Sequence, residues 1–561
     1  MGELDDRLKV VEKKKFKEKK KRDKDNYNRE EGTRKRRRFY LKEDLPEMRC
    51  SPDGPFFLHS IKLRLVEPNQ DFKYRHHNPE LDAQSLGFLS SEPIPAIGPF
   101  TIYSPSGIIK AEVSPVKEVD LTNSQVEDCL EFHRHIFSEV LRLTDLMDFL
   151  GGGIVVVPLR EKEELDTTFL TSFKEYERDL DLQQLEQLVV YPTYKESRDR
   201  YFIESLVDGL EVGDKMPGSS ETFYNYYRRK YNMELQEKGE PFMRISSADK
   251  RPKMLLPSVE TKREARTGLE AVEGATLFLP QLMGVEKVDA GMWRQAQMLP
   301  SILHRVATFL RTKKLLVDLE MWKEDDLTEM DPVKTSSSET SFELLTDSKM
   351  EKNAPQPWQV LEGITLAAAG DVVDMERLEV MGDSFLKFST SVFVYYKSLE
   401  LGEDEYSHKD EGEMTCERSE VVSNLHLFQL AGRLDMQQAI VERTLEPLLA
   451  WQPPGFSRQK LDEYLVHLDS KFGPHVKDPK YRRTLTGGSL LNWLRPEDLP
   501  TILEKSEEEV LDLAMERMMA REFGGVSLRS YKLISDKSIA DCMEAVIGAF
   551  LIHSGQSGAM R

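Results

Sequence analysis

The stretch from Met375 to Lys387 constrains this chain more than any other, because it places three carboxylates in an otherwise apolar helical pattern. Glu376, Glu379 and Asp383 are spaced i, i+3 and i+7, so at about 3.6 residues per turn they share one face of a helix. The apolar residues fall on another face, and we expect a core to bury them and hold the acidic face rigid. These residues are Leu378, Met381, Phe385 and Phe388. A rigid row of carboxylates is typical of a metal site.

A second acidic pair lies near the carboxyl end of the sequence. Asp541 and Glu544 are spaced i, i+3 within the apolar helical pattern of Ser538–Leu551, and Glu411 offers a further carboxylate between the two stretches. Hard oxygen ligands of this kind favour Mg²⁺ or Mn²⁺. Such ions support phosphodiester hydrolysis, in which one ion activates a bound water and a second stabilises the leaving oxygen.

Either acidic row, taken alone, most often forms a solvated helix face, and that alternative stays open at this point. Two such helices in one chain, each with a glycine that allows close helix approach, favour a shared site. The sequence therefore predicts a metal-dependent phosphodiester hydrolysis site built from both helices.

The length and charge of the chain limit the classes of protein to which it can belong. With 561 residues it is too long for one core, so three or four domains are expected. A net charge of -20 with 31% charged residues is typical of a soluble protein with solvated linkers. The longest apolar runs, such as Gly151–Leu159, fall short of the roughly 20 residues that span a bilayer. Met1 does not open a secretory signal, so we expect an intracellular protein with reduced cysteines.

Shifts in composition and periodicity divide the chain into segments of different character. The expected segments are a basic leader (1–40), a small α+β domain (41–150), a domain of short strands (151–290), a long helix (291–323), an acidic flexible linker (324–357), and an all-α domain (358–561) with an insertion near 442–530. The fold class is thus multidomain α+β, with a helical carboxyl-terminal domain.

Two basic features suggest contacts with nucleic acid. Tyrosines at 224, 226, 227 and 231 interleave with Arg228, Arg229 and Lys230, a pattern that suits base stacking and phosphate binding but is more often simply core. The run Arg34–Arg38 is either a solvated tail or a phosphate contact, because arginine donates paired hydrogen bonds to phosphate.

The acidic motifs carry a family resemblance. Residues Glu376–Leu386 (ERLEVMGDSFL) and Asp541–Gly548 (DCMEAVIG) closely resemble the two signatures of the ribonuclease III family. Within that family, Arg418–Asn424 and Leu448–Phe456 resemble the first of the two ribonuclease III domains of the Dicer family. Upstream, Phe88–Pro95 is similar to the Dicer platform, Tyr226–Tyr231 to its PAZ domain (β-barrel-like), and Met292–Arg305 to the connector helix that follows.

The resemblance implies an endoribonuclease that cuts double-stranded RNA or hairpin precursors into small duplexes, as in RNA interference and microRNA processing. The residues that match the family's metal-binding catalytic carboxylates are Glu379, Asp383, Asp541 and Glu544, with Glu376 and Glu411 in supporting roles. Those that match RNA-end contacts are Tyr226, Tyr227 and Tyr194 for the 3′ end, and Arg36, Arg37, Arg38 and Arg251 for the 5′ phosphate. Lys195, Gln281 and Ser247 depart from the residues expected in these pockets.

The resemblance also implies cofactors and partners. Mg²⁺ or Mn²⁺ is the expected cofactor. The expected partners are double-stranded RNA or precursor microRNA, a second ribonuclease III domain that this sequence lacks, double-stranded-RNA-binding proteins and Argonaute. Homodimerisation through the glycine-bearing helices is an alternative to the second domain. The expected location is the cytoplasm, with the nucleus as an alternative. The rival hypothesis is a truncated, noncatalytic scaffold that binds RNA ends.

Overall fold

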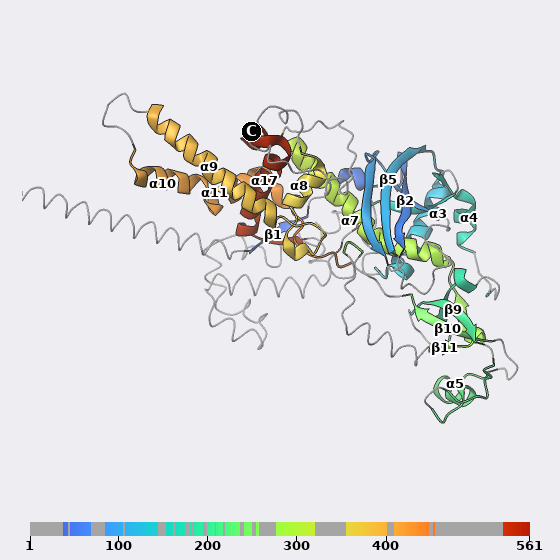
Figure 1. Ribbon diagram of the computed structural model, residues 1–561. Helices are drawn as coiled ribbons and strands as arrows, with labels where there is room; N and C mark the ends of the chain where they lie inside the picture. Colours follow the sequence, from blue (N-terminus) through green and yellow to red (C-terminus); the bar gives the residue numbers. More distant parts are fainter. Residues whose placement is uncertain are drawn as a thin grey trace, which may run out of the picture.

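The structure is a computed structural model. It describes residues 37–42, 45–68, 85–104, 107–143, 153–160, 163–175, 180, 185–194, 199–207, 209–216, 219–235, 241–248, 254–256, 276–319, 355–400, 409–447, 451, 453–454 and 531–560. These residues form two β-rich units, a long helix and a helical unit, arranged along one elongated molecule (Figure 1). The mixed α+β fold class expected from the sequence is confirmed.

A six-stranded antiparallel sheet forms the first unit, with strand order β4-β5-β2-β3-β6-β7. The strands are β2 (Phe56–Pro68), β3 (Leu86–Ser90), β4 (Ile97–Ser104), β5 (Gly107–Val119), β6 (Val155–Arg160) and β7 (Glu164–Leu165). Buried residues alternate along β5, as expected when one face of a sheet packs on a core. Helix α3 (Asn123–His135) begins at a capping box made by Thr122 and Gln125 and packs against β6, and α4 (Thr167–Phe173) follows β7.

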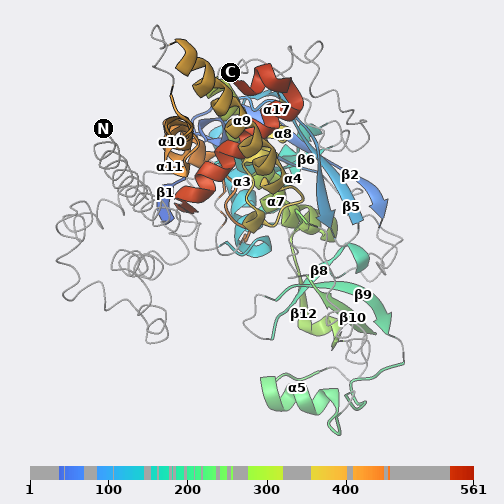
Figure 2. The ribbon, with the colours of Figure 1, turned by 60° about the vertical axis from the view of Figure 1, so that its left-hand side comes forward.

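The second unit is a five-stranded antiparallel sheet with order β11-β10-β9-β8-β12. Its strands are β8 (Val189–Pro192), β9 (Tyr201–Val207), β10 (Phe242–Ser247), β11 (Thr276–Phe278) and β12 (Met283–Val285). Helix α5 (Phe223–Tyr231) lies beyond this sheet, at the end of the molecule farthest from the helical unit (Figure 2). The sheet and α5 have small apolar cores of their own.

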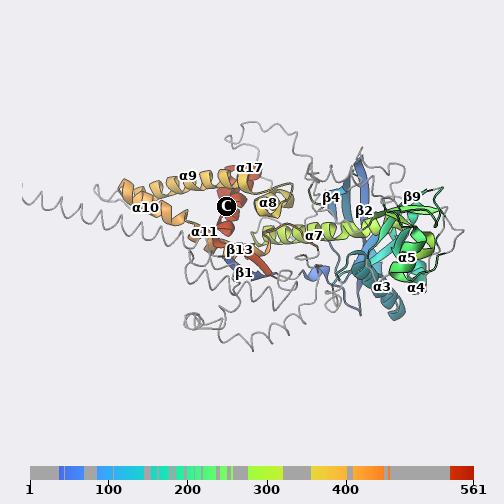
Figure 3. The same ribbon diagram turned by 90° about the horizontal axis from the view of Figure 1, so that it is seen from below.

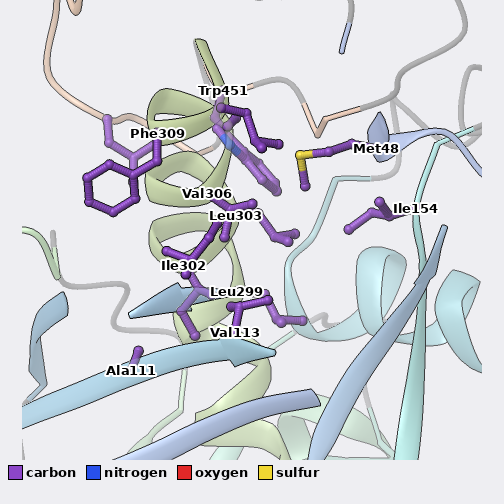
Figure 4. Packing of buried hydrophobic residues seen from close by; sticks show 14 of the residues in the cluster. Met48, Ala111, Val113, Ile154, Leu299, Ile302, Leu303, Val306, Phe309 and Trp451 are labelled. Carbon is purple, nitrogen blue, oxygen red and sulfur yellow. The ribbon is translucent and has the colours of Figure 1, made fainter. Parts of the chain in front are cut away.

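Helix α7 (Ala290–Asp318) joins the two ends of the molecule (Figure 3). Its 29 residues extend about 44 Å at roughly 1.5 Å per residue, and the helix continues through Pro300. Most of its side chains are buried, because the six-stranded sheet of the first unit (the platform-like sheet) covers one side and parts of the helical unit cover another. Figure 4 shows this shared core, in which Trp451 of the helical unit lies beside α7 near Met48. The predicted long helix is therefore a buried central element.

The helical unit contains the two acidic helices predicted from the sequence. Its elements are α8 (Pro357–Gly363), α9 (Glu376–Glu400), α10 (Glu411–Val421), α11 (Asn424–Arg433), β13 (Tyr531–Ser535) and α17 (Asp536–Met560). Helices α9 and α17 make the most extensive helix–helix contact among the described residues. Residues 324–354 of the predicted linker (324–357) and most of the predicted insertion lie outside the described residues, and Pro357, the last residue of that linker, already begins α8. No helix within the described ranges has the length and apolar character needed to cross a membrane.

The apolar face of α9 differs from the prediction. Leu378 is buried, but Met381 and Phe388 are 39% and 65% exposed, so the expectation that this face is covered by a core is wrong for them. Further exposed apolar residues follow along the helix, namely Val380, Val392, Phe393, Tyr395, Tyr396 and Leu399. Helical periodicity finds an apolar face but does not show whether the chain itself covers it. We call these eight exposed residues, Met381 and Phe388 included, the α9 apolar face.

The end of the predicted basic leader belongs to the helical unit. Strand β1 (Arg37–Leu41) pairs antiparallel with β13, and Arg37 is the partner of Ser535, directly before α17. This pairing joins residues about 500 positions apart in the sequence, which local pattern cannot reveal.

Glycines allow α9 and α17 to cross closely. A Cβ at Gly382 would overlap the carbonyl of Glu544, and one at Gly548 would overlap the carbonyl of Leu378. These glycines therefore face each other inside one helical unit. The glycine surfaces are therefore already covered, and a homodimer through these two helices would have to use other faces of them.

We expect Gly382→Ala to destabilise the helical unit by about 1–3 kcal/mol or more, because the added methyl group forces the two backbones apart. The measurement is urea unfolding. Gly432→Ala in α11 is the matched control: its Cβ meets nothing within 4 Å, so a small gain in stability is expected there. Equal stability of Gly382→Ala and the unsubstituted protein would contradict the close crossing.

Candidate active site

Three carboxylates meet where α9 and α17 cross. Glu379 comes from the first turn of α9, while Asp541 and Glu544 come from successive turns of α17. One oxygen from each of these side chains lies within 4.8 Å of the other two. We call these three residues the carboxylate cluster. Their side chains converge because the glycine contact brings the two helix backbones together.

Burial and mutual repulsion disfavour three negative charges in this cluster. Burial raises the pKa of Glu544 to about 7, and the neighbouring charges of Asp383, Asp541 and Glu379 act in the same direction. The pKa of half-buried Glu379 is raised mainly by burial and next by Asp541. A cation would relieve this repulsion, so the cluster is poised to accept one.

Two lysines already contact the acidic residues. Lys537 donates to Asp541 Oδ2 at 2.5 Å, and its Nζ lies 4.0 Å from Glu379 Oε1. Lys387 donates to Asp383 Oδ2 at 2.6 Å. Sequence reasoning missed both lysines as site residues, although each is spaced i, i+4 from its aspartate, a signal that could have found them.

The other predicted carboxylates lie outside the cluster. Asp383 is near enough for its charge to raise the pKa of Glu544, but Lys387 holds its side chain. Glu376 is exposed at the first residue of α9. Glu411 begins α10, beside the end of α9 remote from α17, because α10 runs back along α9 (Figure 1). Of the six predicted carboxylates, the structure brings three together.

The cluster fits a divalent metal ion by the chemistry of its donors. Three carboxylate oxygens are hard ligands of the kind that Mg²⁺ and Mn²⁺ take, and both ions keep water or phosphate oxygens in their remaining positions. Glu379, Asp541 and Glu544 are the residues that would hold such an ion.

Four tyrosines form a second cluster at the opposite end of the molecule. Tyr194 follows β8, and Tyr226, Tyr227 and Tyr231 lie on α5. The Tyr194 ring centroid is 5.3 Å from that of Tyr227 and 4.6 Å from that of Tyr231, while Tyr226 lies 5.3 Å from Tyr227. The structure thus brings the three predicted tyrosines together and adds Tyr231. We call these four residues the tyrosine cluster.

A lysine gives the tyrosine cluster a positive charge. Lys230 Nζ donates to the Tyr226 hydroxyl at 2.8 Å and lies over the rings of Tyr226 and Tyr231. This hydrogen bond lowers the pKa of Tyr226, whereas burial raises the pKa of Tyr227 to about 12. A partly exposed ring such as that of Tyr226, beside an ammonium group, can stack on a base while the ammonium group attracts a phosphate.

The predicted arginines do not join the tyrosine cluster in the described part of the chain. Arg37 and Arg38 lie in β1, against β13 of the helical unit, whereas the tyrosine cluster is at the far end of α7 (Figures 1 and 2). Arg36, Arg251 and Lys195 lie outside the described residues. The tyrosines expected at the RNA 3′ end and the described arginines expected at the 5′ phosphate therefore lie in different units.

Three family models match this chain in sequence order. Residues 49–164 match the platform domain of Dicer, residues 166–308 match the PAZ domain, and residues 376–555 match the ribonuclease III domain. The matched domains follow one another as platform, PAZ and ribonuclease III, which is the order that the resemblance to the Dicer family predicts.

The chain belongs to the Dicer family. It is 27% identical over 370 residues to endoribonuclease Dicer of Gallus gallus, covering 56% of this chain and 19% of that protein. It is 29% identical over 322 residues to endoribonuclease Dcr-1 of Drosophila melanogaster, covering 49% of this chain and 14% of that protein. It is 27% identical over 376 residues to endoribonuclease Dicer homolog 1 of Arabidopsis thaliana, covering 65% of this chain and 16% of that protein. The chain thus spans less than a fifth of the length of these Dicer relatives.

Lys537 should compete with a divalent cation for the carboxylate cluster of this Dicer-family chain. We expect Lys537→Gln to raise the affinity for Mg²⁺ or Mn²⁺ about tenfold in the absence of RNA, because one like charge a few ångströms away is removed. Isothermal titration calorimetry measures this. Lys409→Gln is the control, since Lys409 pairs with Glu417 on α10. Unchanged or weaker binding in Lys537→Gln would contradict the competition.

Proposed function

We propose that this chain is the RNA-end-binding and first nuclease part of an endoribonuclease that cuts double-stranded RNA or hairpin precursors into small duplexes. The observation that carries the proposal is the carboxylate cluster at the crossing of α9 and α17, in a chain of the Dicer family. Its relatives in Gallus gallus and Drosophila melanogaster are named endoribonucleases, which agrees with that chemistry.

The proposed reaction is metal-assisted hydrolysis of a phosphodiester. Bound divalent cations supply activation of water and stabilisation of the leaving oxygen in sites of this kind. Glu379, Asp541 and Glu544 would hold the cation, and Lys537, which pairs with Asp541 and offsets part of the negative charge, would give way to it. We favour Mg²⁺ or Mn²⁺ because all three donors are hard carboxylate oxygens.

The substrate class follows from the distance between the two sites. The tyrosine cluster binds one RNA end by stacking, and α7 separates it from the carboxylate cluster by several helical turns. A stiff A-form duplex spans such a distance, whereas a flexible single strand would not hold a fixed register. The major groove of A-form RNA is too narrow for side chains to read, so shape selects the substrate rather than sequence.

The α9 apolar face is the reason to expect that another domain binds the helical unit. Eight exposed apolar side chains on one helix are an interaction surface rather than a solvent face. We propose that a second ribonuclease III domain covers this face, in the same protein or in another chain, so that two carboxylate clusters act on the two RNA strands.

The rival function is a noncatalytic scaffold that binds RNA ends. Its support is that the tyrosine cluster is assembled, while only three of the six predicted carboxylates converge. A gel assay on a perfect RNA duplex, with and without Mg²⁺, separates the two functions. RNA binding without strand breaks at every metal concentration would favour the scaffold.

Replacing Asp541 or Glu544 by Ala should abolish Mg²⁺-dependent cutting and leave RNA binding intact, because the cluster loses a ligand while the tyrosine cluster is untouched. We expect a loss greater than the roughly 100-fold that removal of an outer-shell partner costs. Cleavage and filter binding of the same duplex give the two readouts. Glu127→Ala, an exposed carboxylate on α3, is the control. Unchanged cleavage in either cluster variant would contradict the catalytic assignment.

Phe388→Glu should weaken association through the α9 apolar face, because a charge placed in an apolar contact loses its hydration. We expect sedimentation velocity to show less self-association, or less binding to an added ribonuclease III domain, with a parallel loss of double-strand cutting. Val66→Glu, at an exposed apolar residue of β2, is the matched control. Full double-strand cutting by a monomeric Phe388→Glu variant would contradict the need for a partner.

A further inference from the structure

Three parts of the molecule meet at one buried ion pair. Arg305 lies midway along α7, and its Nη2 donates to Asp371 Oδ1 of the helical unit at 2.8 Å. The exposed fractions of the two side chains are 7% and 4%. Tyr103 of strand β4 lies close by: burial raises its pKa first, and then the Asp371 charge raises it while Arg305 lowers it. The platform-like sheet, α7 and the helical unit thus share this point.

Asp371 is well placed to transmit the position of α7 to the carboxylate cluster. It lies five residues before Glu376, where α9 begins, and its Oδ1 also accepts a hydrogen bond from the backbone N–H of Val372 at 2.7 Å. Gly370, directly before it, has a positive φ of 56°, which fixes a turn that ordinary side chains rarely adopt. The Asp371 carboxylate is therefore held in place by the turn at Gly370 as well as by Arg305.

The apolar contacts around this pair do not define orientation in the same way. Trp451 and the buried side chains of α7 resist separation of the units, but apolar burial is non-directional and allows small sliding movements. A charge-assisted hydrogen bond requires a specific distance and angle, and either charge left alone in this buried place would be costly. The ion pair therefore selects one orientation among several that bury similar apolar area.

The far end of α7 has a comparable attachment. Arg200, directly before β9 of the tyrosine-bearing unit, donates to Glu139 of the platform-like unit at 3.0 Å and also pairs with Glu286, four residues before α7. With that end fixed, the distance between the tyrosine and carboxylate clusters depends on how the helical unit is oriented against α7, where Arg305 makes its ion pair.

We propose that the Arg305–Asp371 pair is a positioning pair that fixes the spacing between the tyrosine cluster and the carboxylate cluster. Its consequence for RNA rests on the proposed function: the pair then determines where along a bound duplex the cut falls, and so the length of the product and its uniformity.

The double variant Arg305→Met with Asp371→Leu tests this without leaving a buried charge. Replacement of a buried ion pair by apolar residues of similar size is often neutral or stabilising, so the protein should still fold. Arg305→Lys keeps the positive charge beside Asp371, so this variant should keep the spacing of the unsubstituted protein. Arg134→Gln removes an exposed arginine that pairs with Glu127 and Glu131 within α3, and it is the matched control.

Spacing is measured by single-molecule fluorescence transfer between dyes on Asn225→Cys in α5 and Glu420→Cys in α10, both at exposed positions. Half-exposed Cys416 is changed to Ser, and Cys50, Cys129 and Cys542 are buried. We expect the double variant to keep its melting temperature but to show a broadened or displaced transfer distribution. Arg305→Lys and Arg134→Gln should match the unsubstituted protein. A double variant whose distribution superimposes on the unsubstituted one would overturn the proposal.

Product lengths on a long RNA duplex give the functional readout in the assembled nuclease. Broader or shifted products from the double variant are expected, and unchanged lengths despite altered spacing would overturn the role in setting the cut. Absence of cutting by the unsubstituted nuclease would count against the proposed function, while the fluorescence result would still decide whether the pair fixes the spacing.

Discussion

The contact between Gly382 of α9 and Gly548 of α17 is the constraint on which the candidate site depends. Helix axes normally pack about 8–10 Å apart because side chains separate them. Here a Cβ on either glycine would overlap a backbone carbonyl of the other helix, so the two backbones touch. Glu379 and Glu544, one turn before these glycines, and Asp541, two turns before Gly548, are thereby brought within reach of a single ion, which a larger separation of the helices would prevent. The glycines thus contribute to the site only by letting the two helix backbones come close enough for the carboxylates to converge.

Bringing the carboxylates together has an electrostatic cost that the local structure offsets only in part. Lys537 and Lys387 neutralise some of the charge on Asp541 and Asp383. Burial still raises the pKa values of Glu379 and Glu544, because it keeps water from their charged forms. The neighbouring carboxylates raise these pKa values further. The protein therefore folds with unrelieved repulsion at one point. Residual repulsion of this kind is characteristic of a functional site, since a purely structural core would have no use for it.

Local periodicity predicted much of this molecule and failed where long-range contact decides the outcome. The strands at β6, β8 and β9, helix α7 and the two acidic helices follow from spacing of apolar residues, which depends only on neighbours in the chain. The pairing of Asp541 and Glu544 with Glu379 was predicted because both helices carry a glycine. By contrast, nothing near Arg37 in the sequence announces β13 as its partner, and nothing near Asp371 announces Arg305.

Helix α9 also explains why one correct pattern gave one wrong expectation. Its apolar residues recur with helical spacing, as those of α7 do, yet α7 is covered and much of α9 is bare. Periodicity reports which residues seek burial, but the covering surface can belong to another molecule or domain. The same helix carries Glu379 and Asp383 on a different face. Because an α-helix is only about 10 Å wide, a partner that covers Val380 and Met381 lies within about that distance of Glu379. Assembly and chemistry are therefore coupled through one helix: whatever covers its apolar face also shapes the space in which the carboxylate cluster meets RNA.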